Sequence, residues 1–327
     1  MSGGLTPLGS FGERKVLLLV AFLVTTSTVL FQGLQSIFLG LERMIEYNVI
    51  PIFFFALYLG CNFIALKVVK LGLSGVMLSW LLASVLAFLL SAFLLRKNVG
   101  IGTSFNKALL RSSLRLGSKG MLINLLLLLL FRADIYLVNY YLGAGLVGVY
   151  LIAVRFAKML QEMPNIAGTV LFSKIASDAT DMKDHLTAKV SRTILLVTFV
   201  VAVVIILLGR QLILLLFGVR FVDAYPPLIY MLPGILAVAS GSVVNSYLWR
   251  KGYPIIALLA PALSLCINIG LNVLLIPTLG LIGAGLATSV AYILWGALIF
   301  GYFVRNSTLP VRDLLLVRIS DLALKKG

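Results

Sequence analysis

Nine apolar runs of membrane-spanning length recur along this chain, and they constrain its fold more than any other feature. A bilayer core is about 30 Å thick, so a helix needs about 20 apolar residues to cross it. Within that core a helix satisfies its own backbone hydrogen bonds, whereas an open strand or a loop does not. We therefore predict an all-α polytopic membrane protein with spans at 16–40, 49–68, 73–95, 119–142, 146–173, 193–217, 225–248, 254–276 and 281–304.

The composition agrees with this class of protein. Hydrophobic residues make up 61% of the chain and charged residues 12%, against about 25% charged residues in soluble domains. A net charge of +16 can indicate nucleic-acid binding in a soluble protein. Here the cations lie mostly in the loops between apolar runs, so we expect the membrane surface, and no nucleic acid, as their partner.

The distribution of basic residues predicts the orientation. Of the 27 Lys and Arg residues, 18 lie after the first, third, fifth, seventh and ninth spans, 6 lie in the alternate segments, and 3 lie inside spans. Cytoplasmic loops carry the excess of Lys and Arg in membrane proteins. We therefore expect a multi-pass protein of the cell membrane with its C-terminus in the cytoplasm and its N-terminus outside.

A long polar interval divides three spans from six. Within it, Lys107, Arg111, Arg115 and Lys119 recur every four residues, which predicts an amphipathic helix in the cytoplasmic headgroup layer, although a solvated charged loop is the alternative. The expected organisation is a partial N-terminal lobe at 1–95, a cytoplasmic amphipathic linker at 96–118, a C-terminal six-helix lobe at 119–304 and a cytoplasmic basic tail at 305–327.

The fourth and fifth spans carry charges within their apolar sequence. These are Arg132, Asp134, Arg155, Lys158 and Glu162. A charge at such depth costs about 2.5–3.5 kcal/mol on insertion scales, so it is retained where it faces a protein-lined or watery cavity. Because three of the five are cations, we expect a pathway for an anionic substrate.

Several short motifs, taken in order, are similar to those of Wzx-type polysaccharide flippases. In the fourth and fifth spans they are Phe131-Arg132-Ala133-Asp134, Tyr141-Leu142-Gly143, Val147-Gly148-Val149-Tyr150, Ala153-Val154-Arg155-Phe156-Ala157 and Met163-Pro164. Later ones include Leu216-Phe217-Gly218, Ala224-Tyr225-Pro226-Pro227-Leu228, Ile276-Pro277 and Leu279-Gly280-Leu281-Ile282-Gly283-Ala284-Gly285-Leu286-Ala287-Thr288. The chain thus resembles the multidrug/oligosaccharidyl-lipid/polysaccharide exporter superfamily. Members have twelve or fourteen spans in two lobes, and on that template this chain would correspond to spans four to twelve and would lack the first three.

The resemblance implies a cationic cavity that neutralises the pyrophosphate of a lipid-linked sugar. Arg132 is the leading candidate, because a guanidinium binds phosphate bidentately. Asp134 lies about 200° around a helix from Arg132, so it needs another partner, or it is protonatable and couples transport to a proton or cation gradient.

The fifth span places three charged residues on one helical face. Arg155, Lys158 and Glu162 follow the spacing i, i+3 and i+7. Lys158 and Glu162 can pair locally, which would leave Arg155 for the substrate. Two alternatives stay open: a charge network that only packs the lobe, and a Lys158 side chain that extends toward the cytoplasm.

Polar and aromatic residues elsewhere in the spans have less specific expected roles. Asn268 and Asn272, four residues apart, either pack helices together by hydrogen bonds or contact the substrate. A set of aromatic residues near span ends is expected to anchor the membrane interface: Tyr136, Tyr140, Tyr141, Tyr150, Trp249 and Tyr253.

Metal, cofactor and enzyme chemistry are not expected. His185 is the single histidine, and Cys61 and Cys266 both lie in apolar runs, so neither a metal site nor a disulfide framework is predicted. The chain contains no glycine-rich nucleotide-binding loop. A membrane glycosyltransferase would need acidic residues in the outer loops. Among the predicted outer loops that follow the first span, Asp223 is the only acidic residue, so this enzyme class is not expected.

The expected function is to flip a polyprenyl-linked oligosaccharide across the membrane by alternating access of two lobes. The alternatives are a small-molecule or drug exporter of the same superfamily and an inactive fragment. Buried cations favour the glycolipid, because an exporter of cationic drugs would need a net acidic cavity. The partners expected from this function are membrane lipid, a polyprenyl-phosphate-linked glycan, and a glycan polymerase or glycosyltransferases.

Overall fold

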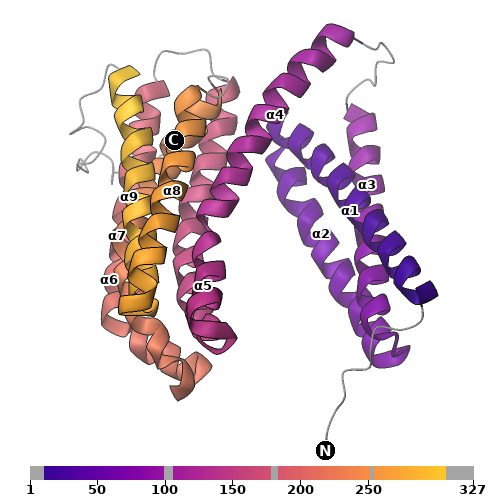
Figure 1. Ribbon diagram of the computed structural model, residues 1–327. Coiled ribbons are helices and arrows are strands. Elements are labelled where there is room, and N and C mark those ends of the chain that lie inside the picture. Colours follow the sequence, from indigo (N-terminus) through magenta and orange to yellow (C-terminus); the bar gives the residue numbers. More distant parts are fainter. Residues whose placement is uncertain (1–10, 99–105, 178–182, 251–253, 307–327) are drawn as a thin grey trace, which may run out of the picture. The chain divides into compact units, whose positions relative to one another are not determined.

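The computed structural model describes residues 11–98, 106–177, 183–250 and 254–306, in which all regular secondary structure is helical. The helices are α1 (Phe11–Gly40), α2 (Met44–Phe63), η1 (Ile64–Val68), α3 (Gly72–Asn98), α4 (Lys107–Leu130), α5 (Ala133–Ser177), α6 (Lys183–Phe217), η2 (Val219–Ala224), α7 (Tyr225–Arg250), α8 (Ile255–Leu279) and α9 (Leu281–Asn306) (Figure 1). The predicted all-α class is confirmed. The predicted basic tail lies outside the described residues from position 307 onward.

Eight stretches of the described chain are long and apolar enough to cross a membrane. The fourth, Lys107–Ala167, contains 61 residues, about three times the length that one crossing needs. It is interrupted at Gly143, where φ is 79° and ψ is 167°. A residue with a side chain is strained at such angles, so glycine supplies the turn. Counted as two crossings, this stretch accounts for the nine predicted spans.

The contacts divide the chain into two units, Met1–Phe105 and Asn106–Gly327. In the first unit α1 packs on α3 through hydrogen bonds between side chains. The hydroxyl oxygens of Ser27 and Ser84 lie 2.6 Å apart, and Trp80 Nε1 donates to Thr28 Oγ1 at 3.0 Å. In a bilayer, water drives no hydrophobic association between helices, so such hydrogen bonds and small residues hold them together.

In the second unit α7 and α9 pack most closely. A Cβ atom at Gly234 of α7 would lie 2.6 Å from the Cα atom of Ser289 on α9. The Gly234 N–H donates to the Ser289 hydroxyl at 2.9 Å. Because no side chain separates the two backbones at this point, α7 and α9 form the buried centre of the unit.

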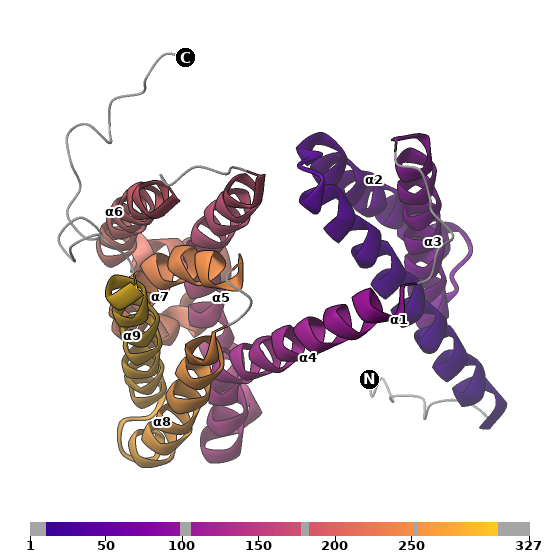
Figure 2. The same cartoon turned by 90° about the horizontal axis from the view of Figure 1, so that it is seen from above.

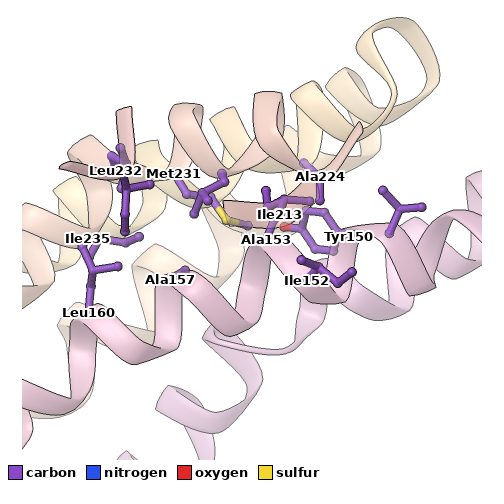
Figure 3. Packing of buried hydrophobic residues seen from close by; sticks show 14 of the residues in the cluster. Tyr150, Ile152, Ala153, Ala157, Leu160, Ile213, Ala224, Met231, Leu232 and Ile235 are labelled. Carbon is purple, nitrogen blue, oxygen red and sulfur yellow. The ribbon is translucent and has the colours of Figure 1, made fainter. Parts of the chain in front are cut away.

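A cluster of apolar side chains joins α5, α6 and α7 around Tyr150, which has no exposed surface. Figure 3 shows the Tyr150 ring among this cluster, with Ile213 of α6 and Ala224 of η2 nearby. These contacts fix the second half of α5 against its neighbours, and with it the charged residues that follow Tyr150 along this helix.

The basic segment before the fourth apolar run is helical. Asn106 caps α4, because its Oδ1 atom accepts hydrogen bonds from the N–H groups of Ala108 and Leu109. From Lys107 the helix continues without a break into the apolar sequence that ends at Leu130. The location of its basic part in the headgroup layer stays a prediction.

Candidate functional site

The apolar run expected to form one helix over 119–142 is interrupted in its middle. Helix α4 ends at Leu130 and α5 begins at Ala133, so Phe131 and Arg132 form a turn. The Arg132 N–H donates to the carbonyl of Leu129 at 3.1 Å. Neither glycine nor proline signals this break in the sequence. It brings Arg132 and Asp134 to the junction of two helices.

Asp134 is buried in a network of hydrogen-bond donors. Its side chain is 2% exposed. Its Oδ2 atom accepts hydrogen bonds from the hydroxyls of Tyr150 at 2.6 Å and Thr288 at 3.2 Å, and its Oδ1 atom accepts one from the N–H of Ile135 at 2.9 Å. The partners that the sequence left open are therefore two hydroxyls and a backbone amide. Among the described residues no ion pair reaches Asp134.

A cavity of about 190 Å³ opens beside this network. Four of the five predicted site residues line it: Arg132, Asp134, Lys158 and Glu162. The other lining residues are polar side chains of α5 and α9 and apolar side chains of α4, the turn after it, α5 and α7: Gln161, Asn165, Thr288, Tyr292, Leu128, Phe131, Val154, Ala157 and Met231. Arg132, Lys158 and Glu162 are exposed whereas Asp134 is buried, so two cations and one carboxylate face the accessible space.

Two expected arrangements differ from the structure. Arg155 is exposed on α5 but does not line this cavity. Within the described chain, Lys158 and Glu162 make no ion pair with each other. Lys158 therefore contributes to the cavity, and Arg155 lies on a neighbouring part of the same helix.

Tyr150 and Thr288 are the site residues that sequence reasoning missed. Tyr150 was expected to anchor the membrane interface, and this is wrong, because it is fully buried and its hydroxyl bonds to Asp134. By contrast, Tyr136 and Tyr140 are 73% and 80% exposed. Trp249 and Tyr253 lie outside the described side chains. Thr288 ends the last motif of the family resemblance, but its contact with Asp134 was not expected, since the two residues lie 154 positions apart along the chain.

Two asparagines form a buried polar pair on α8. Asn268 and Asn272 have no exposed surface, and Asn272 Nδ2 donates to the backbone oxygen of Asn268 at 2.8 Å. Helices α8 and α9 meet at Gly280. Asn272 and Thr288 are equally far from Gly280 in the chain, and at about 1.5 Å per residue they lie at a similar depth. Both hydrogen bonds between the two side chains and backbone run within α8, and among the described residues Asn268 Nδ2 and Asn272 Oδ1 have no hydrogen-bond partner. Whether the pair packs helices together or contacts the substrate stays a prediction.

The chain matches one family model. The family is described as polysaccharide biosynthesis protein, and its model matches residues 14–226. No match to this chain was found among curated proteins.

Solved structures of transporters share the fold. A point mutant of a MATE protein is 16% identical, with a TM-score of 0.76 over 91% of this chain and 71% of that one. A point mutant of the Vibrio cholerae MATE transporter VcmN is 15% identical, with a TM-score of 0.78 over 92% and 72%. The lipid II flippase MurJ, in an inward closed conformation, is 18% identical, with a TM-score of 0.62 over 94% and 66%.

Proposed function

The chain belongs to the polysaccharide biosynthesis protein family, and from that membership we propose that it moves a polyprenyl-linked oligosaccharide across the cell membrane. Together with the fold of MATE transporters and MurJ, this membership confirms the resemblance to the exporter superfamily. We propose a transport function rather than an enzymatic one. The observation that carries the proposal is a cavity among helices of membrane-spanning length, in which Arg132 and Lys158 are both accessible.

The size and charge of the cavity suit the diphosphate group of the substrate. Its volume of about 190 Å³ is smaller than the roughly 300–1,000 Å³ of sites that enclose a drug-sized ligand. An oligosaccharide does not fit within it, but the diphosphate next to the sugar does. Arg132 offers a planar fork of donors and Lys158 a point charge. In this proposal the glycan and the polyprenyl tail lie outside the cavity.

Arg155 and Asp134 have separate proposed roles. Arg155 is exposed one turn before Lys158, so it is a proposed contact for a second charged or polar group of the substrate. Asp134 is the proposed coupling group, because it is a buried carboxylate that touches two helices through Tyr150 and Thr288. Movement between α5 and α9 during alternating access would change its hydrogen bonds. Glu162, accessible in the same cavity, is the second candidate for coupling.

The orientation and partners follow from the charge distribution and the substrate. Because 18 of the 27 basic residues follow the first, third, fifth, seventh and ninth predicted spans, we propose a cytoplasmic C-terminus and an outer N-terminus. The substrate would enter from the inner leaflet, after glycosyltransferases have built it, and would leave to a glycan polymerase outside.

Export of a cationic drug is the second candidate. The accessible Glu162 carboxylate supports it. The two candidates predict opposite responses. If the substrate is the anionic glycolipid, loss of Arg132 should impair transport, whereas transport of a cationic drug should not need this cation.

The test of the proposal is a flipping assay on cells or vesicles that contain the full chain. Arg132→Ala should abolish the appearance of glycolipid in the outer leaflet, and Arg132→Lys should restore part of it, because the bidentate contact is lost while the charge remains. Arg210→Ala removes an exposed cation of α6 that lies away from the cavity, and it serves as the matched control. Normal flipping by the Arg132→Ala protein at normal membrane abundance would refute the phosphate-binding role.

A further inference from the structure

A second crevice lies between the middle of α4 and the beginning of α8, and it is separate from the cavity at Arg132. It has a volume of about 140 Å³ and is lined by Lys119, Leu122, Ile123, Pro254, Ile255 and Leu258. Figure 2 shows α4 and α8 side by side in the second unit.

The crevice has one polar end and apolar walls. Lys119 is the last basic residue of α4 before the apolar sequence begins at Gly120, so the predicted topology puts the boundary between headgroups and hydrocarbon at this residue. The other five lining residues are apolar. Leu122 is 46% exposed and Ile123 is buried, so the wall combines an open surface with a packed floor. A hydrocarbon chain fits such a surface, and a soluble anion gains nothing from it.

Positive charge continues from the polar end of the crevice along α4. Arg115, Arg111 and Lys107 precede Lys119 at intervals of four residues and are all exposed, so they share one face of the helix. Helix α4 contains no acidic residue. Across the crevice α8 begins after Pro254, which provides no side-chain cap. The helix start adds the partial positive charge of its backbone N–H groups to the same end.

We infer that this crevice binds one anionic phospholipid. Its acyl chain lies along Leu122, Ile123 and Leu258, and its phosphate meets Lys119 and Arg115 of α4 beside the start of α8. A neutral phospholipid would use the apolar wall but not the cations. Free phosphate would use the cations but not the wall. This inference does not depend on the proposed transport function, because it concerns a different surface.

The experiment measures lipid binding to the delipidated full-length chain in detergent by native mass spectrometry. The probes are phosphatidylglycerol and phosphatidylcholine with the same acyl chains. One phosphatidylglycerol should remain bound at concentrations where phosphatidylcholine does not. Each cation near a membrane surface contributes about fivefold to binding of an anionic lipid. The double variant Arg115→Gln with Lys119→Gln should therefore weaken phosphatidylglycerol binding about 25-fold.

Matched variants separate the crevice from general charge and apolarity. Leu258→Trp should fill the crevice and displace the lipid, whereas Leu259→Trp changes the next residue, which is 44% exposed and does not line the crevice. Arg210→Gln with Arg220→Gln removes two exposed cations elsewhere in the unit and should leave binding unchanged. Equal retention of the two lipids, unchanged binding by the Arg115 and Lys119 variant, or displacement by millimolar inorganic phosphate would overturn the assignment.

Discussion

At the scale of the residue, Asp134 is the most constrained side chain of the site. It is 2% exposed and accepts hydrogen bonds from Tyr150, Thr288 and Ile135. A buried carboxylate without such donors would be strongly destabilising. The three donors therefore explain how Asp134 persists in an apolar segment. They also connect two points on α5 to α9, so one carboxylate ties the cavity wall together.

The Tyr150 hydroxyl should contribute measurably to stability. In Tyr150→Phe the ring still fills the core, but Asp134 loses its donor at 2.6 Å. Side-chain hydrogen bonds inside membrane proteins contribute about 0.6 kcal/mol on average and up to about 1.7 kcal/mol. We expect a loss near the upper value of about 1.7 kcal/mol, because the acceptor is buried and ionisable. Reversible unfolding in detergent micelles measures it.

Tyr140→Phe is the matched control for this change. Tyr140 is 80% exposed, so removal of its hydroxyl should leave the free energy of unfolding within error of the parent. Equal effects of the two substitutions would show that the contact with Asp134 contributes nothing specific.

At the scale of the element, close helix packing and helix interruptions shape the second unit. Helices α7 and α9 approach until the Gly234 N–H bonds to the Ser289 hydroxyl at 2.9 Å. The interruption between α4 and α5 leaves Arg132 exposed in the middle of the apolar run 119–142. The break at Gly143 separates two predicted crossings. Backbone N–H and C=O groups within a bilayer need hydrogen-bond partners from the protein, both where two helix backbones touch and where a helix is interrupted. The hydrogen bond from Gly234 to the Ser289 hydroxyl is one example.

Gly234→Ala should destabilise the packing of α7 on α9. The added Cβ would lie 2.6 Å from the Cα of Ser289, which is backbone and has no flexible end to move. Overpacking of this kind costs about 1–3 kcal/mol. The free energy of unfolding in detergent should therefore fall by about that amount, measured by the same titration.

Gly270→Ala provides the comparison, because no atom lies within 4 Å of a Cβ at Gly270 on α8. Alanine has a higher helix propensity than glycine by about 1 kcal/mol, so this variant should be as stable as the parent or more stable. Destabilisation by both substitutions to the same extent would contradict close packing as the cause.

At the scale of the whole molecule, the fold is shared far more widely than the sequence. The MATE structures superpose with TM-scores of 0.76 and 0.78 at 16% and 15% identity. Apolar runs of the same length in the same order specify similar helical crossings with many different side chains. The fold is therefore retained although most of the side chains differ.

The membrane topology can be tested on single-cysteine variants that lack Cys61 and Cys266. Cysteines at Gly145 and Thr278, both exposed positions near the predicted outer turns, should react with an impermeant thiol reagent added to intact cells. A cysteine at Ser113, exposed on the basic part of α4, should react only after the membrane is permeabilised. The opposite labelling of Ser113 would reverse the proposed orientation.

The sequence by itself determined the class of fold, the approximate extent of most of the long apolar helices and the turn at Gly143. These follow from local quantities: the length of an apolar run against the thickness of a bilayer, and the backbone freedom of glycine. It also identified four charged residues that line the cavity. Only the tertiary structure placed Tyr150 and Thr288 on Asp134, interrupted the helix at Arg132 and left Arg155 outside the cavity. Those outcomes depend on which helix faces pack together, and residues 154 positions apart meet only through that packing.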